Sequence, residues 1–446
     1  MTSVSGVRGL VGTDLTPEVV ARYAAAFGRI VGAEDGGAVV LARDARTSGP
    51  MFAASARAGL QSVGLDVIDC GLVPTPTAQL AVEHHHARGG IIITASHNPI
   101  EWNALKFVGA DGLFLDGETA ARVLTLGGDG QSVPRVGWDR IGGDATDDAA
   151  VRRHLDAVLG LSVVNVVRIR ERRLTVALDC VRGAGGTVMP ALLERLGCTV
   201  HGMDTETDGR FPRAPEPLPQ NLQGLGRLVR SSGADIGIAV DPDVDRLAVV
   251  DEQGEPIGED YTLAFAVRAV LARGVGPVVV NLSTSLVVDD AARPFGVEVA
   301  RAPVGEANVA RAMRHAGAVI GGEGNGGVIL PALHYGRDAP LAAALVLGLV
   351  AETGERVGEL VAAQPRYTIV KDKVPRGADL ATLYGALERR FADAVFDRQD
   401  GLRLAWPDRW LHVRPSGTEP IVRLIAEART ASEARGLVAA ARALLE

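Results

Sequence analysis

The sequence predicts an α/β fold in which three related α/β domains, with mixed sheets flanked by helices, and a C-terminal α+β domain surround a central cleft. Three observations support this prediction. A strand–loop–helix–strand pattern occurs three times, the pattern changes after about residue 364, and 47% of the 446 residues are hydrophobic. At ~150 residues a domain, the length alone predicts about three domains.

The repeated unit runs in the order strand, polar loop, helix, glycine and strand, which is one α/β unit used three times. Signals such as Ser48-Gly49-Pro50 mark helix starts within it. The glycines of the second unit, at 183, 185 and 186, do not form GxGxxG, so no dinucleotide site is expected. The paired strands are expected at 39–42 and 64–67, at 176–179 and 197–200, and at 278–281 and 296–299.

Polar and glycine-rich stretches mark the expected domain boundaries. They occupy residues 127–131, 144–148 and 251–254. The tail is expected to hold strands at 367–370, 410–413 and 421–426 and helices at 380–390 and 431–445. We therefore expect domains at 1–145, 146–252, 253–364 and 365–446.

Composition limits the class of partner. A formal charge of −8 and an aromatic content of 4% argue against nucleic acid and anionic membrane. Three cysteines, Cys70, Cys180 and Cys198, lack CxxC spacing, so neither a disulfide framework nor a zinc site is expected. The N-terminus lacks the apolar core of a secretory signal, and the longest apolar helical run, 341–351, is too short to span a bilayer. A cytoplasmic protein acting on small molecules is expected.

A candidate nucleophile, Ser96, lies in Thr94-Ala95-Ser96-His97-Asn98-Pro99, directly after a predicted buried strand at 89–93. A hydroxyl on a tight turn at a strand end is held rigidly where a ligand can reach it. The alternative is that Ser96 and Asn98 only make turn hydrogen bonds.

Three aspartates, Asp241, Asp243 and Asp245, lie between predicted strands at 236–240 and 247–250. In an extended segment, alternate residues face the same side, so the three carboxylates are expected to converge. Three like charges repel unless a cation lies among them, and carboxylate oxygens suit Mg²⁺. The alternative is a surface turn rich in Asx bonds. An EF-hand is rejected, since the loop has arginine where glycine is required and a strand follows it.

A candidate phosphate-binding loop runs from Arg414 to Pro420, between two predicted strands. Arginine binds phosphate oxygens bidentately, and a glycine turn exposes consecutive N–H groups to an anion. The alternative is a plain loop. The candidate ligands are Arg414, Ser416, Gly417, Thr418 and Arg423.

Two further cations, Lys106 and Arg8, are candidates for the pocket of the serine. A lysine near a phosphorylated serine can donate a proton or stabilise charge. Each is otherwise a solvated surface cation. Residues 84–86 are three adjacent histidines without ligand spacing, which are interpreted as a polar helix end.

Together these motifs resemble the α-D-phosphohexomutase family, and the resemblance covers essentially the whole chain. The stretches 43–49 and 74–77 fit it as well. The four ordered motifs are the phosphoserine loop at 94–99, the metal loop at 241–246, the sugar-recognition loop at 322–327 and the phosphate loop at 414–420.

The resemblance implies that phospho-Ser96 donates its phosphoryl group to a hexose monophosphate and takes back the other phosphoryl group after the bisphosphorylated sugar reorients. It implies Mg²⁺ as cofactor and hexose 1,6-bisphosphate as intermediate and activator. The implied catalytic residues are Ser96, His97, Lys106 and Arg8; the implied metal ligands are Ser96, Asp241, Asp243 and Asp245; and the implied sugar contacts are Glu323, Asn325 and Arg246.

Two departures from the family pattern bear on the sugar. Many relatives carry Glu-x-Ser-Gly-His at the sugar loop, whereas Glu323 is followed here by Gly-Asn-Gly-Gly; many also carry histidine where this chain has Glu306. The Gly-Glu-Gly-Asn-Gly-Gly form resembles a branch assigned as phosphoglucosamine mutase, so glucosamine phosphate is the favoured substrate. A phosphomannomutase or phosphoglucomutase is the alternative. A Mg²⁺-dependent sugar-phosphate phosphatase and a non-catalytic sugar-phosphate sensor are alternatives of other classes.

Overall fold

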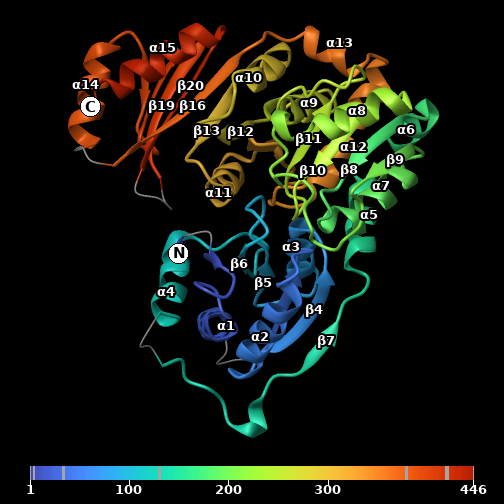
Figure 1. The fold of residues 1–446 in the computed structure, drawn as a ribbon, viewed down its shortest axis with the longest axis vertical. Helices are drawn as coiled ribbons and strands as arrows, with labels where there is room; N and C mark the ends of the chain where they lie inside the picture. The colour runs from blue at the N-terminus through green and yellow to red at the C-terminus, as the bar shows by residue number, and fades with distance from the viewer. Residues whose placement is uncertain are drawn as a thin grey trace.

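The structure, a computed structural model, describes residues 2–3, 6–32, 36–128, 132–376, 380–416 and 421–444. Figure 1 shows four successive sheets along an arc, from the blue N-terminal sheet through green and yellow to the red C-terminal sheet. The predicted fold class, three α/β domains and an α+β domain, is confirmed. Among the described residues, every helix is too short or too polar to cross a membrane.

The first sheet is mixed and carries the predicted serine loop. β5 (Gly89–Ile93) runs parallel to β3 (Ala38–Arg43) and antiparallel to β6 (Trp102–Gly109). Every residue of β5 is buried, because α1 and α2 pack on one face of the sheet and α3 on the other. The remaining elements are β1 (Thr2–Ser3), β2 (Gly6–Leu10), α1 (Pro17–Val31), α2 (Gly49–Gln61), β4 (Asp66–Leu72), α3 (Thr75–His84), α4 (Gly117–Leu126) and β7 (Asp144–Thr146). As predicted, His84 and His85 form the end of a helix.

The second and third sheets are built alike, each with three parallel strands and one antiparallel edge strand. The second has the order β11-β10-β8-β9 and the third β13-β12-β14-β15. Their strands are β8 (Thr175–Asp179), β9 (Thr199–Met203), β10 (Ile236–Val240), β11 (Leu247–Val250), β12 (Val278–Asn281), β13 (Val299–Ala302), β14 (Ile320–Glu323) and β15 (Gly327–Ile329). Their helices are α5 (Ala150–Gly160), α6 (Val166–Arg172), α7 (Met189–Arg195), α8 (Gln223–Ser232), α9 (Glu259–Leu271), α10 (Val287–Ala292), α11 (Glu306–Ala316), α12 (Ala339–Thr353) and α13 (Val357–Ala362).

These two sheets share one hydrophobic core. α12 is buried on all sides from Ala339 to Ala351, which its nearly unbroken apolar sequence requires. It packs against α9 and α6, and its side chains belong to a continuous core that includes strands of both sheets. Burial of this much apolar surface joins the second and third units into one body.

The C-terminal sheet is entirely antiparallel, in the order β16-β20-β19-β18-β17. Its elements are β16 (Thr368–Pro375), α14 (Leu380–Arg390), β17 (Val395–Asp397), β18 (Leu402–Trp406), β19 (Arg409–Pro415), β20 (Ile421–Ala428) and α15 (Ala431–Arg442). Sequence reasoning found both helices and three strands but missed the β17–β18 hairpin. Alternation of apolar and charged residues in Leu402-Arg403-Leu404 was the available signal, since period-two alternation is typical of a strand.

Candidate active site

The loops predicted to carry chemistry occupy equivalent places in the first three sheets. The serine loop joins β5 to β6, the aspartate loop joins β10 to β11, and the sugar loop joins β14 to β15. In each case the loop connects a strand of the parallel set to its antiparallel neighbour. The threefold repeat therefore accounts for the three sites of chemistry.

Ser96 lies against the aspartate loop of the second sheet. Its hydroxyl donates a hydrogen bond to Asp241 Oδ2 at 3.0 Å and lies 3.3 Å from His97 Nδ1. Its backbone N–H donates to Thr94 Oγ1 at 2.9 Å, and its φ of 48° is in the left-handed region that non-glycine residues rarely adopt. Such backbone strain is typical of functional residues held by their surroundings.

Arg46 holds Ser96 in this conformation; it lies in the stretch 43–49 that fits the family, but sequence reasoning gave it no role. This fully buried guanidinium donates to the carbonyl oxygens of Ser96, Asn98, Pro99 and Trp102 at 2.6 to 2.9 Å. Its charge is balanced by Asp44, whose Oδ2 lies 3.1 Å from its Nε. One side chain therefore holds the backbone of the whole serine loop.

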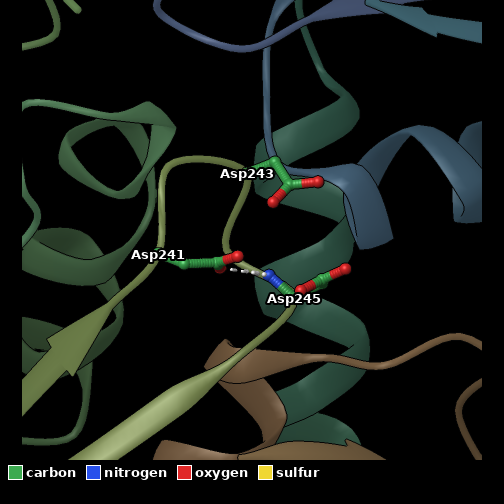
Figure 2. Close-up of side chains that lie close together, drawn as sticks. All are labelled: Asp241, Asp243 and Asp245. Atoms are coloured by element: carbon green, nitrogen blue, oxygen red, sulfur yellow. Dashed lines mark hydrogen bonds between the residues drawn. The ribbon is translucent and has the colours of Figure 1, made fainter. Parts of the chain in front are cut away.

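The three aspartates converge, but not in the way that the sequence predicted. Figure 2 shows their side chains around a tight turn, not along an extended segment. Val244 adopts a φ of 63°, and Asp241 Oδ1 accepts hydrogen bonds from the backbone N–H groups of Asp245 and Arg246 at 3.1 and 3.2 Å. These Asx bonds curl the loop into a turn, as the alternative expected, but all three aspartates are fully buried, so the surface position in that alternative is wrong.

The aspartate cluster fits a hard divalent cation. One carboxylate oxygen of each residue lies within 4.8 Å of the others. Asp243 Oδ1 and Asp245 Oδ1 are buried and accept no hydrogen bond from any described residue. Burial and the other two carboxylates raise the pKa of Asp241 well above its usual range. Buried, unsatisfied oxygens of this type are what Mg²⁺ binds.

Lys106, on β6, contacts the aspartates. Its Nζ lies 2.7 Å from Asp243 Oδ2 and 3.7 Å from Asp245 Oδ2. Burial lowers the pKa of Lys106, but the two carboxylates outweigh burial and raise it above its usual value, so the side chain is charged. Thr75, at the start of α3, donates to the same Asp243 oxygen at 2.8 Å. Lys106 therefore neutralises part of the cluster's charge.

The other predicted cations gather beside the serine. Arg8 Nη1 donates to Asn98 Oδ1 at 2.7 Å, and Arg246 Nη1 donates to Glu216 Oε1 at 3.1 Å. The same Glu216 oxygen is 3.9 Å from His97 Nε2. Burial, together with the charges of Arg246 and Arg8, lowers the pKa of His97 to about 2, which keeps the imidazole neutral.

Arg337, just before α12, is the largest omission of the sequence reasoning. It is buried and meets three carboxylates: Asp245 at 2.5 Å, Glu323 at 2.7 Å and Glu306 at 3.0 Å. It therefore links the metal loop to the sugar loop. A charged pair, Arg337-Asp338, at the start of an almost wholly apolar helix was the available signal, because its burial follows from that of the helix.

Glu323 ends β14 and lies in a fixed position. Its Oε1 accepts from Asn281 Nδ2 at 2.9 Å and from the Gly305 N–H at 3.0 Å. Burial raises the pKa of Glu323, but Arg337 outweighs it and holds the pKa below its usual value. Asn325 Oδ1 accepts from the Gly327 N–H within the turn, at 3.2 Å.

The described part of the phosphate loop pairs two cations. Arg414 and Arg423 are directly opposite each other in the β19–β20 ladder. Two guanidinium groups placed side by side in this way can bind the same phosphate. Ser416 donates its N–H to the Ile421 carbonyl at 2.9 Å. Gly417 and Thr418 lie outside the described residues.

Comparison with known proteins agrees with this geometry. Four models of phosphoglucomutase/phosphomannomutase domains match in order: domain I at residues 2–127, domain II at 152–254, domain III at 258–367 and the C-terminal domain at 369–444.

Individual relatives match along their whole length. A probable phosphoglucosamine mutase of Methanopyrus kandleri is 38% identical, over 97% of this chain and 95% of the relative. A phosphoglucomutase/phosphomannomutase of Thermococcus kodakarensis is also 38% identical, over 99% and 97%. The crystal structure of a phosphoglucomutase/phosphomannomutase family protein from Burkholderia thailandensis superposes with a TM-score of 0.86 at 28% identity, over 100% of this chain and 98% of that one. The chain therefore belongs to the α-D-phosphohexomutase family, whose members are isomerases that move a phosphoryl group within a sugar.

Proposed function

We propose that the protein is a Mg²⁺-dependent phosphohexomutase that interconverts hexose 1-phosphates and 6-phosphates through phospho-Ser96 and a hexose 1,6-bisphosphate. The observation that carries the proposal is the contact between the Ser96 hydroxyl and Asp241, one of three converging buried aspartates. A serine set against a cation site is suited to hold and transfer a phosphoryl group.

Buried cations of the chain hold the serine loop and the metal-loop carboxylates in place. Arg46 holds the serine loop, and Lys106 and Arg337 each fix carboxylates of the metal loop. Ser96, Asp241, Asp243 and Asp245 would hold Mg²⁺, which when bound supplies positive charge beside the serine phosphate. Neutral His97 lies 3.3 Å from the serine oxygen and can share a hydrogen bond with it, which helps to orient the hydroxyl.

The sugar and its non-reacting phosphate are proposed to contact two different loops. Glu323 faces sugar hydroxyls, with Asn325 and Arg246 as further contacts. Arg414, Ser416, Gly417, Thr418 and Arg423 hold the phosphate that is not reacting, with Arg414 and Arg423 as its charged partners. One phosphate is then held at Ser96 and the metal loop, and the other at the phosphate loop. With both held in the site, the phosphoryl group moves between sugar positions and is not transferred to water.

Glucosamine phosphate is the proposed preferred sugar. The Gly-Glu-Gly-Asn-Gly-Gly loop supports this choice, as does a relative whose name is probable phosphoglucosamine mutase. Mannose and glucose phosphates are the second candidates, since an equally similar relative is named phosphoglucomutase/phosphomannomutase.

The discriminating experiment measures kcat/KM for glucosamine, mannose and glucose 1-phosphates side by side, with glucose 1,6-bisphosphate present. We expect the highest value for glucosamine 1-phosphate, and 6-phosphate formation faster than release of inorganic phosphate. Faster release of inorganic phosphate would identify a phosphatase instead. Binding of these sugar phosphates without either reaction would identify a sensor.

Removal of the metal is expected to stop turnover. Chelation should lower kcat at least about 10²-fold, and added Mg²⁺ should restore it, since the cation's charge stabilisation contributes several kcal/mol. Asp243→Asn should weaken activation by Mg²⁺, because it removes a charged ligand. Asp251→Asn, in the exposed turn after β11, is the matched control. Full activity in chelator would contradict the metal proposal.

A further inference from the structure

Asp400 lies in the turn between β17 and β18 and faces the third sheet. Its Oδ2 accepts hydrogen bonds from Arg414 Nε at 2.8 Å and from the backbone N–H of Val304 at 3.1 Å. Arg414 belongs to the C-terminal sheet and Val304 to the loop before α11, so one carboxylate oxygen joins the two domains. The side chains of Asp400 and Arg414 are only 17% and 18% exposed, which limits screening of the pair by solvent.

The turn that carries Asp400 is fixed to its surroundings. The Asp400 carbonyl oxygen accepts from His412 Nε2 at 2.7 Å, so this nitrogen carries the proton. Burial lowers the pKa of His412 to about 4, and the neutral ring accepts from Ser283 Oγ through Nδ1, at 2.8 Å. Gly401 follows with a φ of 78°, and a Cβ there would lie 2.3 Å from the Val413 oxygen. Asp400 therefore cannot move without breaking these contacts.

The bond from Arg414 determines how its guanidinium can meet a phosphate. Nε donates to Asp400, and no other hydrogen bond joins this guanidinium to a described residue. Bidentate binding of a phosphate uses two parallel N–H groups. With Nε held, the two terminal nitrogens form that pair, on the edge of the guanidinium away from Asp400.

The hydrogen bond from the Val304 N–H to Asp400 connects the C-terminal domain to a loop that also contacts Glu323. Gly305, the next residue, donates its N–H to Glu323. Two consecutive backbone N–H groups are thus held by two carboxylates, Asp400 from the C-terminal domain and Glu323 from the sugar loop. Gly305 has a φ of 119°, which only glycine adopts readily, so this conformation is built into the sequence.

On the basis of the proposed function, we propose that Asp400 is a positioning residue that orients Arg414 toward the non-reacting phosphate and keeps the phosphate loop in register with Glu323. Asp400 itself does not contact the substrate. Its removal leaves Arg414 charged but free to rotate, and it unlinks the C-terminal domain from the loop beside Glu323. Substrate binding should suffer more than the transfer step.

The test uses the full-length protein with glucose 1-phosphate as the probe. Asp400→Ala should raise KM about tenfold or more and lower kcat much less, since a hydrogen bond to a charged group contributes about a factor of ten or more. Asp397→Asn, at the end of β17, is the control: among the described residues its side chain bonds only Gln399, so KM should be unchanged. In an Arg414→Ala background, adding Asp400→Ala should change KM less than about twofold.

Calorimetric Kd values for glucose 1-phosphate separate this inference from the proposed function. A wild-type protein that binds the probe but converts no hexose phosphate would refute the mutase proposal, and the Kd of Asp400→Ala would still test the role of Asp400. An Asp400→Ala protein whose KM and Kd match those of Asp397→Asn would overturn the inference. A full additional effect in the Arg414→Ala background would do the same, because Asp400 would then act independently of Arg414.

Discussion

Ser96→Ala is expected to abolish mutase turnover and the phosphorylated form of the protein. Loss of the nucleophile in covalent catalysis removes the reaction path itself, so kcat should fall at least about 10⁴-fold. Intact-mass spectrometry after treatment with glucose 1,6-bisphosphate should find one phosphoryl group on the wild type and none on the variant. Binding of sugar phosphates should persist, because Arg414 and Glu323 are unchanged.

The matched control is Ser55→Ala on α2, whose hydroxyl bonds, among the described residues, only the Met51 carbonyl of its own helix. It should retain the phosphorylated form and full activity. A phosphorylated Ser96→Ala protein that still turns over would show that another residue carries the phosphoryl group. That result would contradict the proposed mechanism, which assigns the phosphoryl group to Ser96 because its hydroxyl contacts Asp241 of the metal loop.

Arg337→Met should destabilise the protein by about 3–5 kcal/mol, the usual cost of leaving a buried charge without its partner. Its removal leaves Asp245, Glu306 and Glu323, all three buried, without the guanidinium that pairs with them. Activity should also fall, because Glu323 loses the contact that fixes it beside the metal loop. Urea unfolding and thermal midpoints measure the stability change.

Arg314→Met provides the comparison for Arg337. Arg314 pairs with Asp111 at 3.1 Å, but both side chains are about half exposed, so its loss should cost about 0–1 kcal/mol. In the Arg337→Met background, Glu306→Gln should recover part of the lost stability by removing one uncompensated carboxylate. Equal unfolding free energies for Arg337→Met and Arg314→Met would contradict the role assigned to Arg337.

Local pattern was sufficient to find the elements that carry the chemistry. The apolar strand before Ser96 and the two apolar strands around Asp241 to Asp245 were evident because burial imposes strand-like sequences. The shape of the aspartate loop was not, since the sequence allowed both an extended segment and a turn rich in Asx bonds, and only the structure shows the turn with its left-handed Val244. The β17–β18 hairpin was missed because its first strand is only three residues long.

The sequence by itself determined the order of the domains, the fold class, and the chemical type of each loop: a hydroxyl, three carboxylates, a glutamate and a pair of arginines. These properties reside in short segments and survive without knowledge of distant neighbours. Only the tertiary structure decided which of them meet. Arg337 joins Asp245, 92 residues away, to Glu323, and Arg46 holds Ser96 from 50 residues away. The physical reason is that a buried charge is stable only beside partners that folding brings to it, and those partners come from distant parts of the chain, in the case of Arg337 and Asp245 from two domains.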